Sequence, residues 1–147
     1  MKFKLFIILL FSALTVGCVK NVEYKVTVLF ENKSSYDIAF VSVVESWVDG
    51  QKVAVGAEDR YTIKVAESAT VTTNSRGGDI SVGDIWLNKD IDYIRFGDGL
   101  KVDIAGGKYM DNATYTLFSS EADGEVYIYT FTDEDYQYAV ENGTTLE

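Results

Sequence analysis

The residue types best able to do chemistry are sparse in this chain of 147 residues, which has one cysteine, Cys18, and no histidine. Without histidine the chain lacks the commonest metal ligand and the usual general base near neutral pH, which excludes a Ser-His-Asp triad. A single thiol can form neither a Cys/His zinc site nor an intramolecular disulfide. We therefore expect no catalytic residue, no cofactor and no metal site, and predict that the chain is not an enzyme.

Five aspartates in the second half of the chain raise two alternatives, a calcium site and paired carboxylates for glycoside hydrolysis. They are Asp84, Asp90, Asp92, Asp98 and Asp103. No segment matches an EF-hand loop, Asp-Gly pairs are common in turns, and spacing along the sequence does not give separation in space. We interpret these aspartates as turn residues on a solvated surface.

Three aromatic residues near predicted turns or strand ends are candidates for a ligand-stacking site, namely Trp47, Trp86 and Tyr109. An exposed aromatic side chain can bury a large area against a sugar ring or a protein partner. The alternative for the two tryptophans, which we prefer, is that they fill the core of the fold. We expect a glycan or protein partner only if these aromatic side chains are exposed.

Cys18 ends a segment with the layout of a secretory signal peptide. Lys2 and Lys4 form a basic start, residues 5–14 are almost all apolar, and Gly17 lies directly before the cysteine. The apolar run is too short for a membrane-spanning helix of about 20 residues. Because it ends in Gly-Cys, the segment resembles the lipobox of bacterial lipoproteins, in which signal peptidase II cleaves before a lipid-modified cysteine. An unlipidated secreted protein is the alternative.

The lipobox resemblance implies how the chain is processed and where it resides. Residues 1–17 would be a signal peptide, cleaved between Gly17 and Cys18, and residues 18–21 would hold the lipidated cysteine and a short tether. The implied diacylglyceryl and N-acyl groups, of the palmitate type, supply the several acyl chains that stable anchoring needs. We expect contact with the membrane through this lipid, in the bacterial cell envelope and at its outer membrane. The periplasmic and surface faces both remain open.

The chain is acidic, with 13 basic residues, 23 acidic residues and a net charge of −10. The first 17 residues hold two of the lysines and no acid, so the mature chain would carry −12. Nucleic-acid binding needs clustered Lys and Arg, so we expect no nucleic-acid partner. We interpret the acidity as a source of solubility.

Apolar and polar residues alternate over several segments, which is the period of half-buried β-strands. Strands are predicted over residues 22–30, 38–44, 61–65, 69–73, 80–87, 91–96, 100–104, 113–118 and 125–131. Hairpin turns are predicted at residues 49–50, 97–99 and 121–124 because each contains an Asp-Gly pair.

A short helix is predicted after the last strand. Thr132 can cap a helix whose first turn is acidic, Tyr136, Ala139 and Val140 repeat at helical spacing, and Gly143 marks the end. We expect Tyr136 and Val140 to cover an apolar face of the preceding strand.

These elements predict a mainly β fold, an antiparallel β-sandwich with one short C-terminal helix. An immunoglobulin-like topology is plausible on strand count alone, and a closed barrel is the main alternative. We see no internal repeat or linker within residues 22–147, which we expect to form a single domain.

Two stretches resemble a group of small cell-envelope lipoproteins common in Bacteroidota. Residues 94–101 read IRFGDGLK, similar to the group's strand, Asp-Gly turn and Lys-containing strand, and residues 129–136 read YTFTDEDY, similar to its closing strand-to-helix segment. The resemblance implies a β-sandwich on a lipid anchor and brings no catalytic residues. We therefore predict a non-catalytic binding or structural module. The alternatives are an accessory carbohydrate-binding lipoprotein that uses exposed aromatics and a minor fimbrial component.

Overall fold

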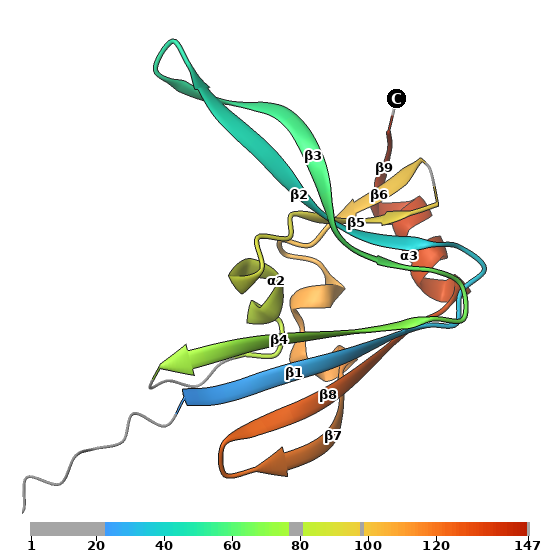
Figure 1. The fold of residues 1–147 in the computed structure, drawn as a ribbon. Coiled ribbons are helices and arrows are strands. Elements are labelled where there is room, and N and C mark those ends of the chain that lie inside the picture. Colours follow the sequence, from blue (N-terminus) through green and yellow to red (C-terminus); the bar gives the residue numbers. More distant parts are fainter. Residues whose placement is uncertain (1–22, 77–80, 98, 147) are drawn as a thin grey trace, which may run out of the picture.

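The computed structural model describes residues 23–76, 81–97 and 99–146, which form two β-sheets with a shared core. The first sheet has the strand order β4-β1-β8-β7, and the second has the order β3-β2-β5-β6-β9 (Figure 1). The strands are β1 (Glu23–Asn32), β2 (Ile38–Val48), β3 (Gln51–Ile63), β4 (Ser68–Arg76), β5 (Tyr93–Phe96), β6 (Leu100–Asp103), β7 (Thr116–Glu121), β8 (Gly124–Phe131) and β9 (Thr144–Thr145). The helical segments are α2 (Asp84–Asn88), α3 (Asp133–Asn142) and the 3-10 turns η1 (Lys108–Met110) and η2 (Asn112–Thr114). The predicted mainly β fold with a helix near the C-terminus is confirmed.

Strand pairing departs from a purely antiparallel sandwich at the centre of the first sheet. There β1 is antiparallel to β4 and parallel to β8. A parallel pair cannot be closed by a tight turn and needs a crossover connection, and here that crossover includes four of the five strands of the second sheet, β2, β3, β5 and β6. The first long strand of the described chain and its last one therefore lie side by side.

The core lies between the two sheets and is rich in aromatic side chains. The ring centroid of Phe40 on β2 is 4.8 Å from that of Phe30 on β1 and 4.8 Å from that of Trp86 on α2. The ring centroid of Phe131 on β8 lies 6.0 Å from that of Phe30. These four side chains are at most 1% exposed. Because each buries a large apolar area, they hold both sheets and α2 together.

One buried polar side chain fixes the corner where the chain passes from the first sheet to the second. The amide nitrogen of Asn32, the last residue of β1, donates to the carbonyl oxygens of Tyr36 at 2.8 Å and Ile63 at 3.0 Å. Its Oδ1 accepts from the backbone nitrogen and the hydroxyl of Ser34, at 3.0 and 2.7 Å. Because these polar atoms are paired, the amide is buried at little cost, and it ties the start of β2 to the end of β3.

The strand predicted over residues 80–87 is wrong, because residues 84–88 form the helix α2. The indole nitrogen of buried Trp86 donates to the carbonyl oxygen of Tyr109 at 3.0 Å and to the hydroxyl of Tyr115 at 2.7 Å. Gly83 packs so closely against the backbone of Met110 that a Cβ at residue 83 would lie 2.5 Å from the carbonyl oxygen of Met110. These non-local contacts outweigh the local strand preference.

The helix α3 begins where the sequence predicts, because the Thr132 hydroxyl accepts a hydrogen bond from the backbone nitrogen of Glu134 at 3.3 Å. Tyr136 is half-buried and Ala139 is buried, whereas Val140 is exposed. The prediction that Val140 covers the sheet is therefore wrong. Within the described ranges, no helix has the length and apolarity needed to cross a membrane.

Candidate functional site

The hairpin of β2 and β3 projects beyond the two sheets (Figure 1). Residues 38–41 of β2 pair with both β3 and β5, whereas residues 43–48 pair with β3 alone. The turn residues Asp49 and Gly50 have φ angles of 49° and 79°, as expected of a two-residue hairpin turn. We call residues 43–58 the arm, and every side chain from 44 to 58 is exposed.

The strand register places different side chains on the two faces of the arm. Residues paired across antiparallel strands share a face, and faces alternate along each strand. Val44, Val48 and Val53 therefore continue the core-facing side of β2 beyond the point where it is covered, and each is 41–48% exposed. Trp47 pairs with Lys52 on the opposite face, and Trp47 is 69% exposed.

A groove of about 450 Å³ lies between the edge of β2 in the arm, including Trp47, and the loop that follows α2. We call it the Trp47 groove. The aromatic and hydrogen-bonding side chains of its lining are Ser42, Glu45, Ser46, Trp47, Lys52, Asp90 and Asp92. The groove therefore combines one exposed aromatic ring with hydrogen-bonding groups from the arm and from the loop after α2.

The charged groups of the groove hold one another in place. Lys52 Nζ lies 2.9 Å from Glu45 Oε2. This hydrogen bond and the charge of Glu45, with a smaller contribution from Asp90, raise the pKa of Lys52. Asp92 Oδ2 accepts a hydrogen bond from the backbone nitrogen of Val43 at 2.6 Å. Asp92 thus occupies the edge of β2 just beyond the last residue that pairs with β5.

The core helix α2 positions the loop that supplies the two aspartates. The backbone nitrogens of Asp90 and Ile91 donate to the carbonyl oxygens of Leu87 at 3.2 Å and Trp86 at 2.9 Å. Asp90 has a φ of 57°, a left-handed conformation that Asp and Asn tolerate better than most residues. Buried Trp86 therefore fixes one wall of the groove without lining it.

The structure separates the three predicted stacking residues. Trp47 is exposed at the groove, so the preferred prediction that it fills the core is wrong. Trp86 and Tyr109 are at most 1% exposed, so the preferred prediction that Trp86 fills the core is confirmed, and the candidate role in an exposed stacking surface is wrong for both residues. The ring centroids of Trp86 and Tyr109 lie 6.4 Å apart in the core. Nearness to a turn in the sequence does not reveal which side of an element is covered.

The five aspartates occupy separate places. Asp84 starts α2, where its Oδ2 accepts from the backbone nitrogen of Ser81 at 3.1 Å, and Asp103 ends β6. Asp90 and Asp92 meet only at the Trp47 groove, while Asp98 lies outside the described residues, as do Gly17 and Cys18. Across the described ranges, no three potential ligands come together to hold a metal ion.

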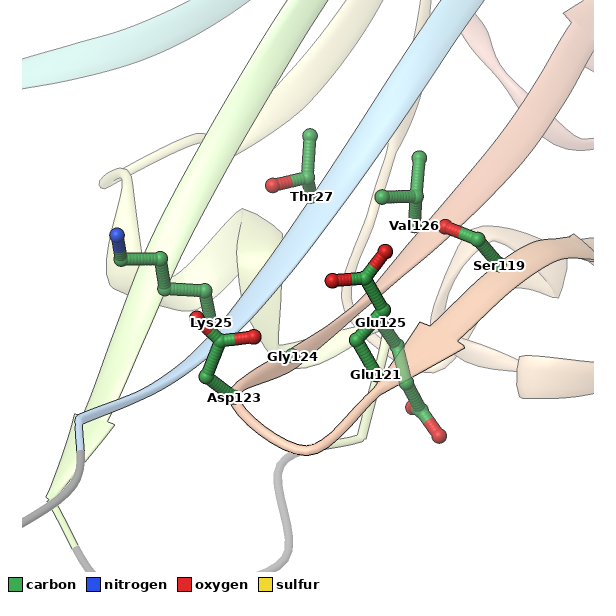
Figure 2. A pocket seen from close by; sticks show the side chains of 8 residues that line it. All are labelled: Lys25, Thr27, Ser119, Glu121, Asp123, Gly124, Glu125 and Val126. Carbon is green, nitrogen blue, oxygen red and sulfur yellow. The ribbon is translucent and has the colours of Figure 1, made fainter.

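A smaller hollow of about 210 Å³ lies where the turn between β7 and β8 meets β1 (Figure 2). Figure 2 shows Lys25 of β1 beside Asp123 of the turn, with Glu121 and Glu125 on the flanking strands. The Tyr127 hydroxyl donates to Glu125 Oε2 at 2.7 Å. None of the residues that line this hollow is aromatic, so it offers less to a ligand than the Trp47 groove.

A third hollow, of about 470 Å³, is mainly apolar and lies between α3 and the turn from β5 to β6. The parallel rings of Tyr36 and Tyr136 stack there with centroids 3.8 Å apart. Phe96, Leu100 and exposed Val140 complete its apolar lining. This hollow presents few hydrogen-bonding groups, so it would recognise a ligand by shape alone.

Sequence reasoning missed Glu45 and Lys52, and it treated Asp90 and Asp92 as ordinary turn residues. The available signal was the length of extended sequence on both sides of Asp49-Gly50. The two hairpin strands have 11 and 13 residues, whereas a usual strand has about five or six residues. Comparisons of the chain with protein families, curated proteins and solved structures gave no match.

Proposed function

We propose that this chain is a lipid-anchored protein of the bacterial cell envelope whose β domain is a non-catalytic binding module, with its binding surface on the arm. The signal-peptide layout that ends at Gly17 and Cys18 supports the anchor. The mature chain would be acylated on Cys18, and the short tether would hold the first strand, β1, close to the membrane. The periplasmic and surface faces remain alternatives.

The observation that carries the binding role is the exposure of the arm. A hairpin with one tryptophan and four valines turned to solvent is costly to leave uncovered, and exposed apolar patches on soluble domains commonly mark interaction sites. The arm reaches beyond both sheets (Figure 1), so a ligand can approach either face. A merely structural role would give no reason to extend β2 and β3 past their neighbours.

A non-catalytic role fits the chemistry of the groove. Glu45 is paired with Lys52, and one oxygen of Asp92 is bound by the backbone nitrogen of Val43. The chain has no histidine to serve as a base near neutral pH. These groups can bind and orient a ligand, and none of them is an activated nucleophile.

Metabolic labelling with a clickable fatty acid tests the anchor. Wild-type chain should incorporate the label, Cys18→Ala should not, and Ser12→Ala, a change within the leader, should be labelled like wild type. Unchanged labelling of Cys18→Ala would refute lipidation at this residue.

Hydroxyl-radical footprinting of intact cells tests the binding surface without assuming a ligand. Trp47 should be oxidised several-fold less in cells than in the purified full chain, because the occupied arm is covered. Phe118 on β7, which is also strongly exposed, is the matched control and should react equally in both samples. Equal oxidation of Trp47 in both would show that the arm is unoccupied and that the binding role is wrong.

A further inference from the structure

We propose that the Trp47 groove binds an uncharged, hydroxyl-rich glycan, with one pyranose ring stacked on the indole of Trp47. This inference rests on the proposed binding role of the arm and names the class of its ligand. The sugar ring would stack on the Trp47 face of the arm, since the exposed valines of the opposite face offer no hydrogen bonds to a sugar.

The indole supplies the apolar part of the recognition. Trp47 is the aromatic side chain of the groove, and it is 69% exposed. It pairs across the hairpin with Lys52. An aromatic face can cover the C–H side of a pyranose, which is apolar, while the sugar hydroxyls point outward around the ring. Because the arm projects beyond both sheets (Figure 1), such a ring can accept a sugar within a long polysaccharide.

The polar groups around the indole match the needs of hydroxyls. Carboxylates accept hydrogen bonds from hydroxyl groups, and an ammonium donates to hydroxyl oxygens. Asp92 keeps one oxygen free of the bond to Val43, and Asp90 and Ser46 lie on the same lining. Because Asp92 and Lys52 are already held by Val43 and Glu45, little side-chain entropy is lost when the sugar binds.

The charge of the groove selects among glycans. Glu45, Asp90 and Asp92 carry three negative charges, and Lys52 carries one positive charge. The whole chain is also strongly acidic. Like charges across an interface oppose binding, so uronic-acid and sulfated polysaccharides should be rejected and neutral ones accepted.

The test is calorimetric titration of the full chain in detergent micelles with manno-, xylo- and gluco-oligosaccharides, and with oligogalacturonate as the charged counterpart. At least one neutral series should bind with a dissociation constant in the millimolar range or below, and oligogalacturonate should bind at least about tenfold more weakly. The chain has two tryptophans, and Trp86 is buried, so a change of indole fluorescence on binding reports on Trp47.

Three variants sharpen the result. Trp47→Ala should weaken binding about thirtyfold, the loss typical of an aromatic hot spot, and Trp47→Phe should recover part of it. Phe118→Ala removes another exposed aromatic far from the groove and should leave affinity unchanged. Asp90→Asn tolerates the same left-handed backbone and should raise the affinity for oligogalacturonate relative to the neutral sugar about threefold, because one repulsive charge is lost.

Absence of binding by every neutral series, equal binding of oligogalacturonate, or full affinity in folded Trp47→Ala would each overturn the proposal. The footprinting experiment separates this failure from that of the binding role. If Trp47 is protected in cells while no glycan binds, the arm has a protein ligand and only the glycan inference falls.

Discussion

Asp135 is buried at the start of α3, and its two carboxylate oxygens accept hydrogen bonds from three different segments. Oδ1 accepts from the Tyr129 hydroxyl on β8 and from the Lys108 ammonium on η1. Oδ2 accepts from the backbone nitrogen of Thr132 at 2.8 Å, which closes the capping box of the helix. A single side chain therefore joins β8, the helix α3 and the segment that follows β6.

We expect Asp135→Ala to lower the free energy of unfolding by about 3 kcal/mol, because it leaves the buried Tyr129 hydroxyl and the Lys108 ammonium without their acceptor. Urea denaturation of the full chain in detergent measures this change. Glu134→Ala, at an exposed neighbouring position, is the control and should stay within about 0.5 kcal/mol of wild type. Equal stabilities for the two variants would show that Asp135 does not hold these segments together.

At the scale of elements, the arm is the part of the fold with the least support. Its strands pair only with each other, and a two-stranded hairpin is marginally stable in water without further packing. The neighbouring half of β2 is instead buried between β3 and β5. We therefore expect the arm to open locally without global unfolding, and this freedom would let it adjust to a ligand.

Gly50→Ala should speed hydrogen exchange of the arm amides and leave the unfolding of the domain unchanged. A Cβ at Gly50 would touch nothing within 4 Å, so the cost is that of its left-handed φ of 79°, about 1–2 kcal/mol. Gly56→Ala is the matched control, because Gly56 also has open space around it but no positive φ. If Gly50→Ala lowers global stability by its full cost, the arm unfolds together with the sheets.

At the scale of the whole molecule, buried tyrosines link stability to alkaline pH. Burial raises the pKa values of Tyr109, Tyr115 and Tyr129 well above the ordinary value of 10.0, and the charge of Asp135 adds to the effect for Tyr109 and Tyr129. These phenols lose their protons in the unfolded chain near pH 10 and keep them in the folded one. Their contribution to the free energy of unfolding is therefore complete below about pH 10 and is lost as the pH rises further.

We expect alkaline titration of the full chain to show two groups of tyrosines. Exposed phenols should ionise without a change in circular dichroism, and the buried ones should ionise together with unfolding. Tyr127→Phe is the comparison, because the hydrogen bond to Glu125 raises the pKa of Tyr127 only to about 12 at a partly exposed site. It should shift the unfolding pH less than Tyr129→Phe does. Ionisation of all tyrosines before unfolding would contradict the burial argument.

Local features of the sequence predicted the local elements of this fold. Alternation over residues 22–30 predicted β1, Asp49-Gly50 and the residues 121–124 predicted two hairpins, and Thr132 predicted the start of α3. Each of these depends on neighbours within a few residues, because strand period, turn conformation and helix capping are short-range effects. The signal-peptide layout and the lipobox resemblance are also local, and they remain predictions about the first 18 residues.

Only the tertiary structure decided which faces are covered. It paired β1 with β8 in parallel, folded residues 84–88 into a helix around Trp86, and left Trp47 in solvent. It also brought Asp92 to Val43 at the base of the arm, 49 residues away in the sequence. The two tryptophans have the same propensities, and what separates them is the set of side chains packed around each one. Burial depends on residues distant in the sequence, and no local pattern contains that information.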